Sequence, residues 1–215
     1  YKTTLLTSIK LKWIGDKLNK CRNDKMDSKE FYKPIKQQFN DIAKWYIVYL
    51  KKMTNFETFL ERDENGNFKL FHLPENMEQN YRIFEHLHSS LLYTHTAIVT
   101  IDETKMLLKK YHNKEPMDFS EKFLLNTCFI YGIQASLTIC YNEGINVRKD
   151  KHMLTPEQMN KIDHELFINC AYFYSKMMTH SGNLFTVKAL LLWSKYMLLV
   201  LGNEISDDIF AKAVY

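Results

Sequence analysis

The fold is indicated most clearly by residues 155–179, TPEQMNKIDHELFINCAYFYSKMMT. Thr155 is a good helix cap, Pro156 suits a first helical turn, and Gln158 stands three residues after the cap, as in a capping box. These signals predict a helix of about 20 residues that ends near Thr179. Similar helical patterns extend from this segment in both directions along the chain.

On the amino-terminal side, apolar side chains recur every three or four residues over residues 5–21, 31–60 and 77–98. Pro74 is predicted as the first residue of the third helix, and Thr100 to Glu103 form a capping box that starts a shorter one. A further helix begins at a cap on Asp118 or Ser120. Because this helix is apolar on nearly all sides, we expect it to be buried.

On the carboxy-terminal side, residues 181–183 end the helix predicted over residues 155–179 and cap another helix over residues 184–201. A last helix is predicted to begin at Ser206. Residues 184–201 are apolar enough to suggest a membrane span. They include Lys188 and Lys195, however, and number only about 18, so the central helix of a protein core is the better prediction.

The predicted fold class is therefore all-α: one bundle of about seven or eight helices over residues 1–215, with at most one short hairpin near residues 60–71. The hairpin is suggested by Asn65-Gly66, a common turn pair. Since the sequence begins at Tyr1 without Met and ends within a helical pattern at Tyr215, we expect this domain to belong to a longer chain.

Composition favours a folded intracellular protein. Of 215 residues, 46% are hydrophobic and 25% charged, which excludes disorder over most of the length. The four cysteines are far apart and form no Cys-x-x-Cys pair, so we expect reduced thiols and a cytoplasmic or nuclear location.

The motifs of several enzyme classes are missing. The sequence has neither of the glycine-rich phosphate-binding loops and no Gly-x-Ser-x-Gly elbow. Paired carboxylates such as Asp102-Glu103 lie at predicted helix starts, where capping explains them. We therefore expect no catalytic residues and no cofactor.

Two patterns suggest metal binding. His164-Glu165 begins like a zinc-protease helix, but Ile168 occupies the position of the second histidine. Glu85, His88 and His95 share a predicted helical region, so a metal-dependent helical enzyme stays a further alternative. Half-packed, half-solvated side chains at a helix boundary are the favoured explanation of these residues, so the metal prediction is none.

The first 60 residues carry most of the positive charge, with 13 Lys and Arg against 6 Asp and Glu. An acidic surface on a partner protein would complement this charge; nucleic acid is a less favoured partner, and solvated helix faces are the plain alternative. The candidate partner-binding residues are Lys10, Lys17, Lys20, Lys33 and Lys36.

Aromatic and methionine side chains gather on the last long helices, at a spacing typical of core filling. An alternative is an apolar pocket between helices that admits a lipid-like ligand or a partner helix. The candidate pocket residues are Phe129, Ile133, Phe173 and Trp193.

The order of helices from Phe123 to Leu201 resembles that of the helical regulatory region in fungal zinc-cluster transcription regulators. This resemblance implies a ligand-sensing regulatory region, but the six-cysteine zinc module of that family is absent from this sequence. Helix order alone therefore assigns no family.

Taken together, these patterns predict a non-enzymatic helical module that belongs to a larger intracellular protein. The module is expected to bind another protein or to have a regulatory role. A helical ligand-sensing domain with an apolar pocket, such as the regulatory region of a transcription regulator, is the alternative. The module is expected to act through grooves between its helices.

Overall fold

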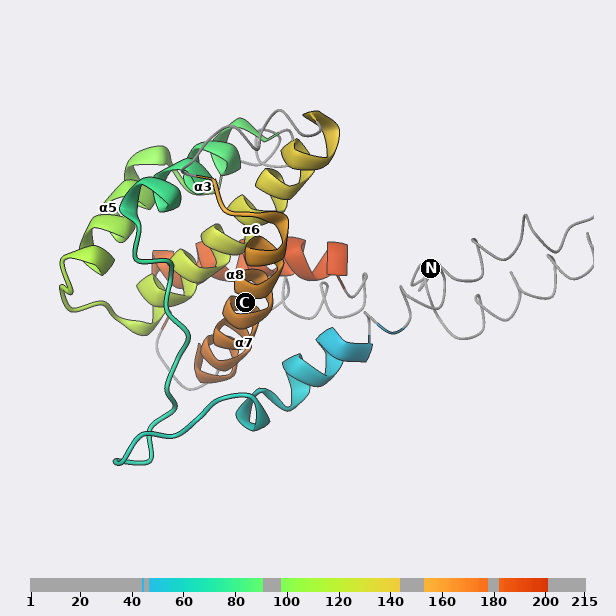
Figure 1. Cartoon of the computed structure of the whole chain (residues 1–215). Helices are drawn as coiled ribbons and strands as arrows, with labels where there is room; N and C mark the ends of the chain where they lie inside the picture. Colours follow the sequence, from blue (N-terminus) through green and yellow to red (C-terminus); the bar gives the residue numbers. More distant parts are fainter. Residues whose placement is uncertain (1–43, 45–46, 91–97, 144–152, 178–181, 201–215) are drawn as a thin grey trace, which may run out of the picture.

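The computed structural model describes residues 44, 47–90, 98–143, 153–177 and 182–200, and these residues are mostly helical (Figure 1). The named helices are η1 (Phe56–Thr58), a short 3-10 helix, and the α-helices α3 (Met77–Ser89), α5 (Ile101–His112), α6 (Phe119–Glu143), α7 (Pro156–Met177) and α8 (Leu184–Val200). Residues 47–54 are also helical. The predicted all-α class is confirmed.

Within the described residues, the number of helices is slightly lower than the number predicted for the whole chain. Six helices are named among the described residues, against the seven or eight expected over the whole chain. The helices predicted over residues 5–21 and from Ser206 onward lie outside the described residues.

The predicted helix caps are present as hydrogen bonds. The hydroxyl of Thr155 accepts from the backbone N–H of Gln158 at 3.2 Å, and the Gln158 side chain accepts from the Thr155 N–H at 2.9 Å. Likewise, the hydroxyl of Thr100 accepts from the backbone N–H of Glu103 at 3.1 Å, and the Glu103 carboxylate accepts from the Thr100 N–H at 2.8 Å. Of the two candidates for the cap of α6, Asp118 makes the bond: its carboxylate accepts from the backbone N–H three residues on at 2.7 Å.

The predicted helix start at Pro74 is wrong. α3 begins at Met77, because the side chain of Asn76 accepts from the backbone N–H groups of residues 78 and 79 at 3.0 and 3.3 Å. The Pro74 carbonyl instead accepts a 2.7 Å hydrogen bond from the side chain of Asn80. Pro74 therefore lies in the connection that leads into the helix.

Where a short hairpin was predicted, the structure has a turn closed by a single β-bridge. An isolated antiparallel bridge joins Arg62 and Phe68, and Gly66 adopts a φ of +80°, which glycine tolerates at no steric cost. The guanidinium of Arg62 lies 4.0 Å from the centre of the Phe68 ring. This turn projects from the helical body in Figure 1.

Helix α6 forms the centre of the core and contacts α3, α5, α7 and α8 (Figure 1). Among the described residues, this is the one helix long and apolar enough to cross a membrane, over Phe119–Cys140. Its most apolar window is 78% buried inside the protein. Packing against the other helices thus accounts for its composition.

Helices α3 and α6 approach closely at Gly132. A Cβ atom added to this residue would lie 2.5 Å from Cγ2 and 2.6 Å from the backbone oxygen of Ile83. Because both distances are shorter than van der Waals contact, only glycine lets the two helices pack at this separation.

Candidate functional site

A cavity of about 790 Å³ lies between α3 and the first turns of α5. The two helices run antiparallel, since Asn80 contacts His112 at 3.1 Å while His88 contacts Thr104 at 2.9 Å. The volume lies within the range of about 300–1,000 Å³ that is typical of ligand pockets.

The apolar part of the cavity wall consists of Tyr81, Phe84 and Ile101. Phe84 is almost fully buried and edge-on to Phe129 of α6, at 5.7 Å between ring centres, so the core holds it in place. Ile101 is 51% exposed although it begins a helix, a position where polar residues are common. Of these three residues, Ile101 thus offers apolar surface that the described part of the protein leaves uncovered.

One polar wall of the cavity is organised by Thr104. Its hydroxyl donates to the carbonyl of Ile101 at 2.8 Å, so it accepts from Nε2–H of His88 at 2.9 Å. Burial, and then the charge of Lys105, lower the pKa of His88. His88 is therefore a neutral imidazole at pH 7, with its proton on Nε2.

The charged rim contains Glu78, Glu85 and Lys105. Arg82 lies between the two carboxylates, 3.0 Å from Glu85 and 3.7 Å from Glu78, and pairs with both. No carboxylate of the described residues lies within ion-pair distance of the Lys105 ammonium.

Only some of the residues suggested for a metal site are brought together among the described residues. Glu85 and His88 line the same cavity, whereas His95 lies outside the described residues. Within the described part of the chain, no group of three His, Cys, Asp or Glu side chains is arranged to hold a metal ion.

The predicted apolar pocket residues lie in the closed core and not at this cavity. Phe129, Ile133, Phe173 and Trp193 are each at most 1% exposed, and none lines the cavity between α3 and α5. In the described structure, the indole N–H of Trp193 has no hydrogen-bond acceptor.

The predicted partner-binding lysines are all in the first 43 residues, outside the described part of the chain. They are Lys10, Lys17, Lys20, Lys33 and Lys36. An acidic partner for that region stays a prediction.

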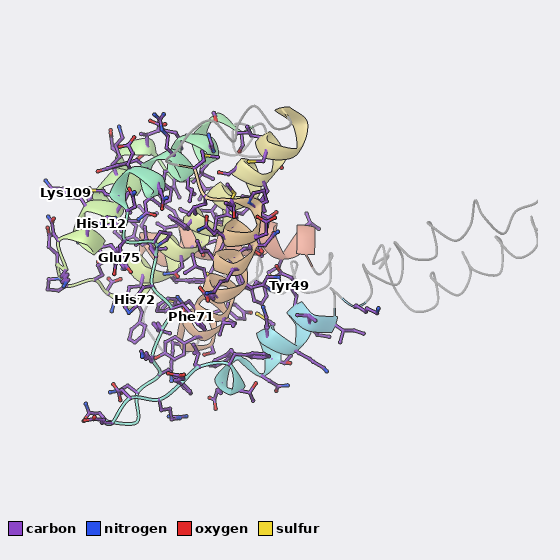
Figure 2. All side chains as sticks on the ribbon, in the orientation of Figure 1. Tyr49, Phe71, His72, Glu75, Lys109 and His112 are labelled. Carbon is purple, nitrogen blue, oxygen red and sulfur yellow. The ribbon has the colours of Figure 1, made fainter. Side chains whose placement is uncertain are left out.

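A buried polar cluster, which the sequence did not suggest, is centred on Asp163 of α7. The Asp163 carboxylate, 2% exposed, accepts hydrogen bonds from the hydroxyl of Tyr49 at 2.7 Å, the amide of Gln134 at 3.0 Å and the hydroxyl of Tyr196 at 3.0 Å. Figure 2 shows Tyr49 pointing from residues 47–54 toward α7. Burial raises the pKa of Asp163, and the three donated bonds oppose that rise.

Beside this cluster, the ammonium of Lys52 contacts Nδ1 of His164. An ammonium has no acceptor, so His164 accepts and is a neutral imidazole protonated on Nε2. Burial, and then Lys52, lower the pKa of His164. None of these residues lines the cavity between α3 and α5. The cluster joins residues 47–54 to α6, α7 and α8.

Part of the cavity lining could have been recognised from the sequence. Glu78, Tyr81, Glu85 and His88 are spaced by three or four residues and therefore share a face of α3. The opposite wall, from α5, depends on how the two helices pack, and no sequence spacing reports that.

No family model and no solved structure matches the chain. The chain is similar to Halotolerance protein 9 of Saccharomyces cerevisiae, with 30% identity over 216 residues. The similarity covers 100% of this chain but 20% of that protein, so the chain spans about a fifth of its relative's length.

Proposed function

We propose that this chain is a non-enzymatic interaction module of a larger intracellular protein, and that it binds a partner in the cavity between α3 and α5. The observation that carries the proposal is the apolar part of the cavity wall, at which the side chain of Ile101 is 51% exposed, together with the charged side chains that border it. Grooves between helices with an apolar floor and a polar rim are common binding sites for protein segments.

The relative adds a biological context. Because Halotolerance protein 9 is named for salt tolerance and contains a similar segment, we propose that this module serves the same kind of response. In that role the module would regulate through the partner it holds.

The test uses Ile101→Asp, which places a charge in the apolar wall. Its side chain is half exposed and an acid is favourable in a first helical turn, so the fold is expected to persist. Leu198→Asp on α8 is the matched control, since Leu198 is 46% exposed and lies away from the cavity.

Proteins captured from an extract of the source cells by each form are compared by quantitative mass spectrometry. We expect a defined set that is lost with Ile101→Asp and retained with Leu198→Asp. Identical sets from wild type and Ile101→Asp would refute binding at this cavity.

A ligand-sensing role is the second candidate. It is favoured by the volume of the cavity, which is typical of small-molecule pockets. Native mass spectrometry of the purified protein separates the two roles, because a sensor is expected to retain a small apolar molecule.

A further inference from the structure

The buried polar cluster also holds the helical residues 47–54 against the rest of the protein. These residues lie at the edge of the helical body in Figure 1. The Tyr49 hydroxyl donates to Asp163 at 2.7 Å, and Lys52, three residues further along the same face of the helix, contacts His164. Two consecutive residues of α7 therefore receive two side chains from this helix.

The contact between Lys52 and His164 depends on the protonation state of the imidazole. Lys52 is only 8% exposed, and no carboxylate of the described residues lies within ion-pair distance of its ammonium. The ammonium donates to Nδ1 of His164, which accepts only while the imidazole is neutral. A protonated imidazole would carry an N–H at Nδ1 and place a second positive charge beside the first. The contact therefore favours docking of the helix in one protonation state and opposes it in the other.

The other charged and titratable side chains around this contact come from residues 47–54, α7 and α8: Tyr49, Lys161, Asp163, Glu165 and Tyr196. α6 contributes Gln134, whose amide is neutral. Burial raises the pKa of Asp163, so proton uptake by Asp163 favours the docked helix as the pH falls and acts against His164. A test must therefore separate these two titrations.

We propose that the contact between Lys52 and His164 is a pH switch, which holds residues 47–54 on α7 while His164 is neutral and releases them when His164 gains a proton. Release would uncover the ring of Phe167, which is buried and lies edge-on to the Tyr49 ring at 4.7 Å between ring centres. Neither Lys52 nor His164 lines the cavity between α3 and α5, so the switch does not rest on the proposed function.

The size of the response follows from linkage. In the released state the pKa of His164 is close to 6.5, whereas burial, and then Lys52, lower this pKa in the docked state. Docking is therefore at full strength above about pH 6.5 and weakens below it. Because one proton is taken up, His164 raises the equilibrium constant for release by at most about tenfold between pH 7.5 and pH 5.5.

The test measures hydrogen exchange of the full chain by mass spectrometry at pH 7.5 and pH 5.5, with rates corrected for the chemical effect of pH. Helices owe most of their stability to packing, so residues 47–54 exchange faster once released. His164→Gln keeps an acceptor for Lys52 and leaves Asp163 in place but gains no proton. We expect acidification to raise the release constant of residues 47–54 by about three- to tenfold more in wild type than in His164→Gln.

Two further variants locate the switch. His88→Gln makes the same substitution at a half-buried histidine of α3 that contacts Thr104 instead, and it should keep the wild-type response. Lys52→Met removes the facing charge and should reduce the response; it also provides the test if His164→Gln does not fold.

The proposal is overturned if wild type and His164→Gln respond equally, if Lys52→Met keeps the full response, or if His88→Gln loses as much of it as His164→Gln. An equal rise in exchange over α5, whose residues do not contact His164 in the described structure, would show unfolding of the whole protein and would likewise overturn it.

Discussion

Asp163 shows how a single buried carboxylate organises the packing around it. Three donors from residues 47–54, α6 and α8 meet on its two oxygens, which keeps the carboxyl group hydrogen-bonded despite its burial. Removing the carboxylate leaves these donors buried without an acceptor. Replacing it by an amide keeps one acceptor oxygen.

Asp163→Ala is therefore expected to lower the free energy of unfolding by about 3–5 kcal/mol. Asp163→Asn is expected to lower it by less than about 2 kcal/mol, since the amide oxygen retains part of the hydrogen bonding. Urea unfolding followed by circular dichroism measures both. Equal losses for the two variants would show that the donors do not depend on this acceptor.

His164 predicts a response to pH. Its pKa is lower in the folded protein than in the unfolded chain, so the unfolded chain takes up a proton first as the pH falls below about 6.5. The contribution of His164 to stability is thus complete above that pH and is lost below it.

We therefore expect the free energy of unfolding to fall between about pH 7.5 and about pH 5.5. His164→Gln, which retains an acceptor for Lys52 but does not titrate, should show a smaller fall. His88 has a lowered pKa for the same main reason, so His88→Gln serves as the comparison that separates the two contributions. An unchanged pH dependence in His164→Gln would contradict this assignment.

At the scale of elements, the contact of α3 with α6 depends on the missing side chain of Gly132. Gly132→Ala would gain helix propensity but force Ile83 to move, and the backbone oxygen of Ile83 cannot rotate away as a side chain would. Overpacking of this kind typically costs about 1–3 kcal/mol.

We expect Gly132→Ala to destabilise the protein by about that amount in urea unfolding. Gly182→Ala is the control, because its added methyl group would meet nothing closer than 3.7 Å. The control should stay within about 0.5 kcal/mol of wild type. A neutral Gly132→Ala would mean that α3 can shift along α6 without loss.

The elements also show which features a sequence can predict. The caps at Thr100 and Thr155 were predicted correctly because both partners of each bond lie within three residues. The helix start predicted at Pro74 was wrong because the side chain of Asn76, two residues later, caps the helix instead. Asp163 could not be predicted, since Tyr49, Gln134 and Tyr196 are 114, 29 and 33 residues away in the sequence.

At the scale of the whole molecule, α6 packs against α3, α5, α7 and α8 and so joins them in one core. Phe129 lies fully buried in this core and touches Phe84 of α3. Because α7 and α8 contact the same helix, the described helices should lose their structure in a single cooperative step.

Phe129→Ala is accordingly expected to cost about 3–5 kcal/mol. Hydrogen exchange should report the same loss of protection in α3, α6, α7 and α8, while the exposed turn around Gly66 exchanges early in both proteins. If only α3 and α6 lost protection, the core would consist of separable units.

The apolar length of α6 has a consequence for synthesis of the chain. When the ribosome has released α6 but not yet α7 and α8, two of the helices that cover it do not exist. The nascent protein then displays a segment that resembles the substrates of membrane-insertion machinery. Correct maturation should therefore depend on chaperones that shield this segment until α8, which ends at Val200, has left the ribosome.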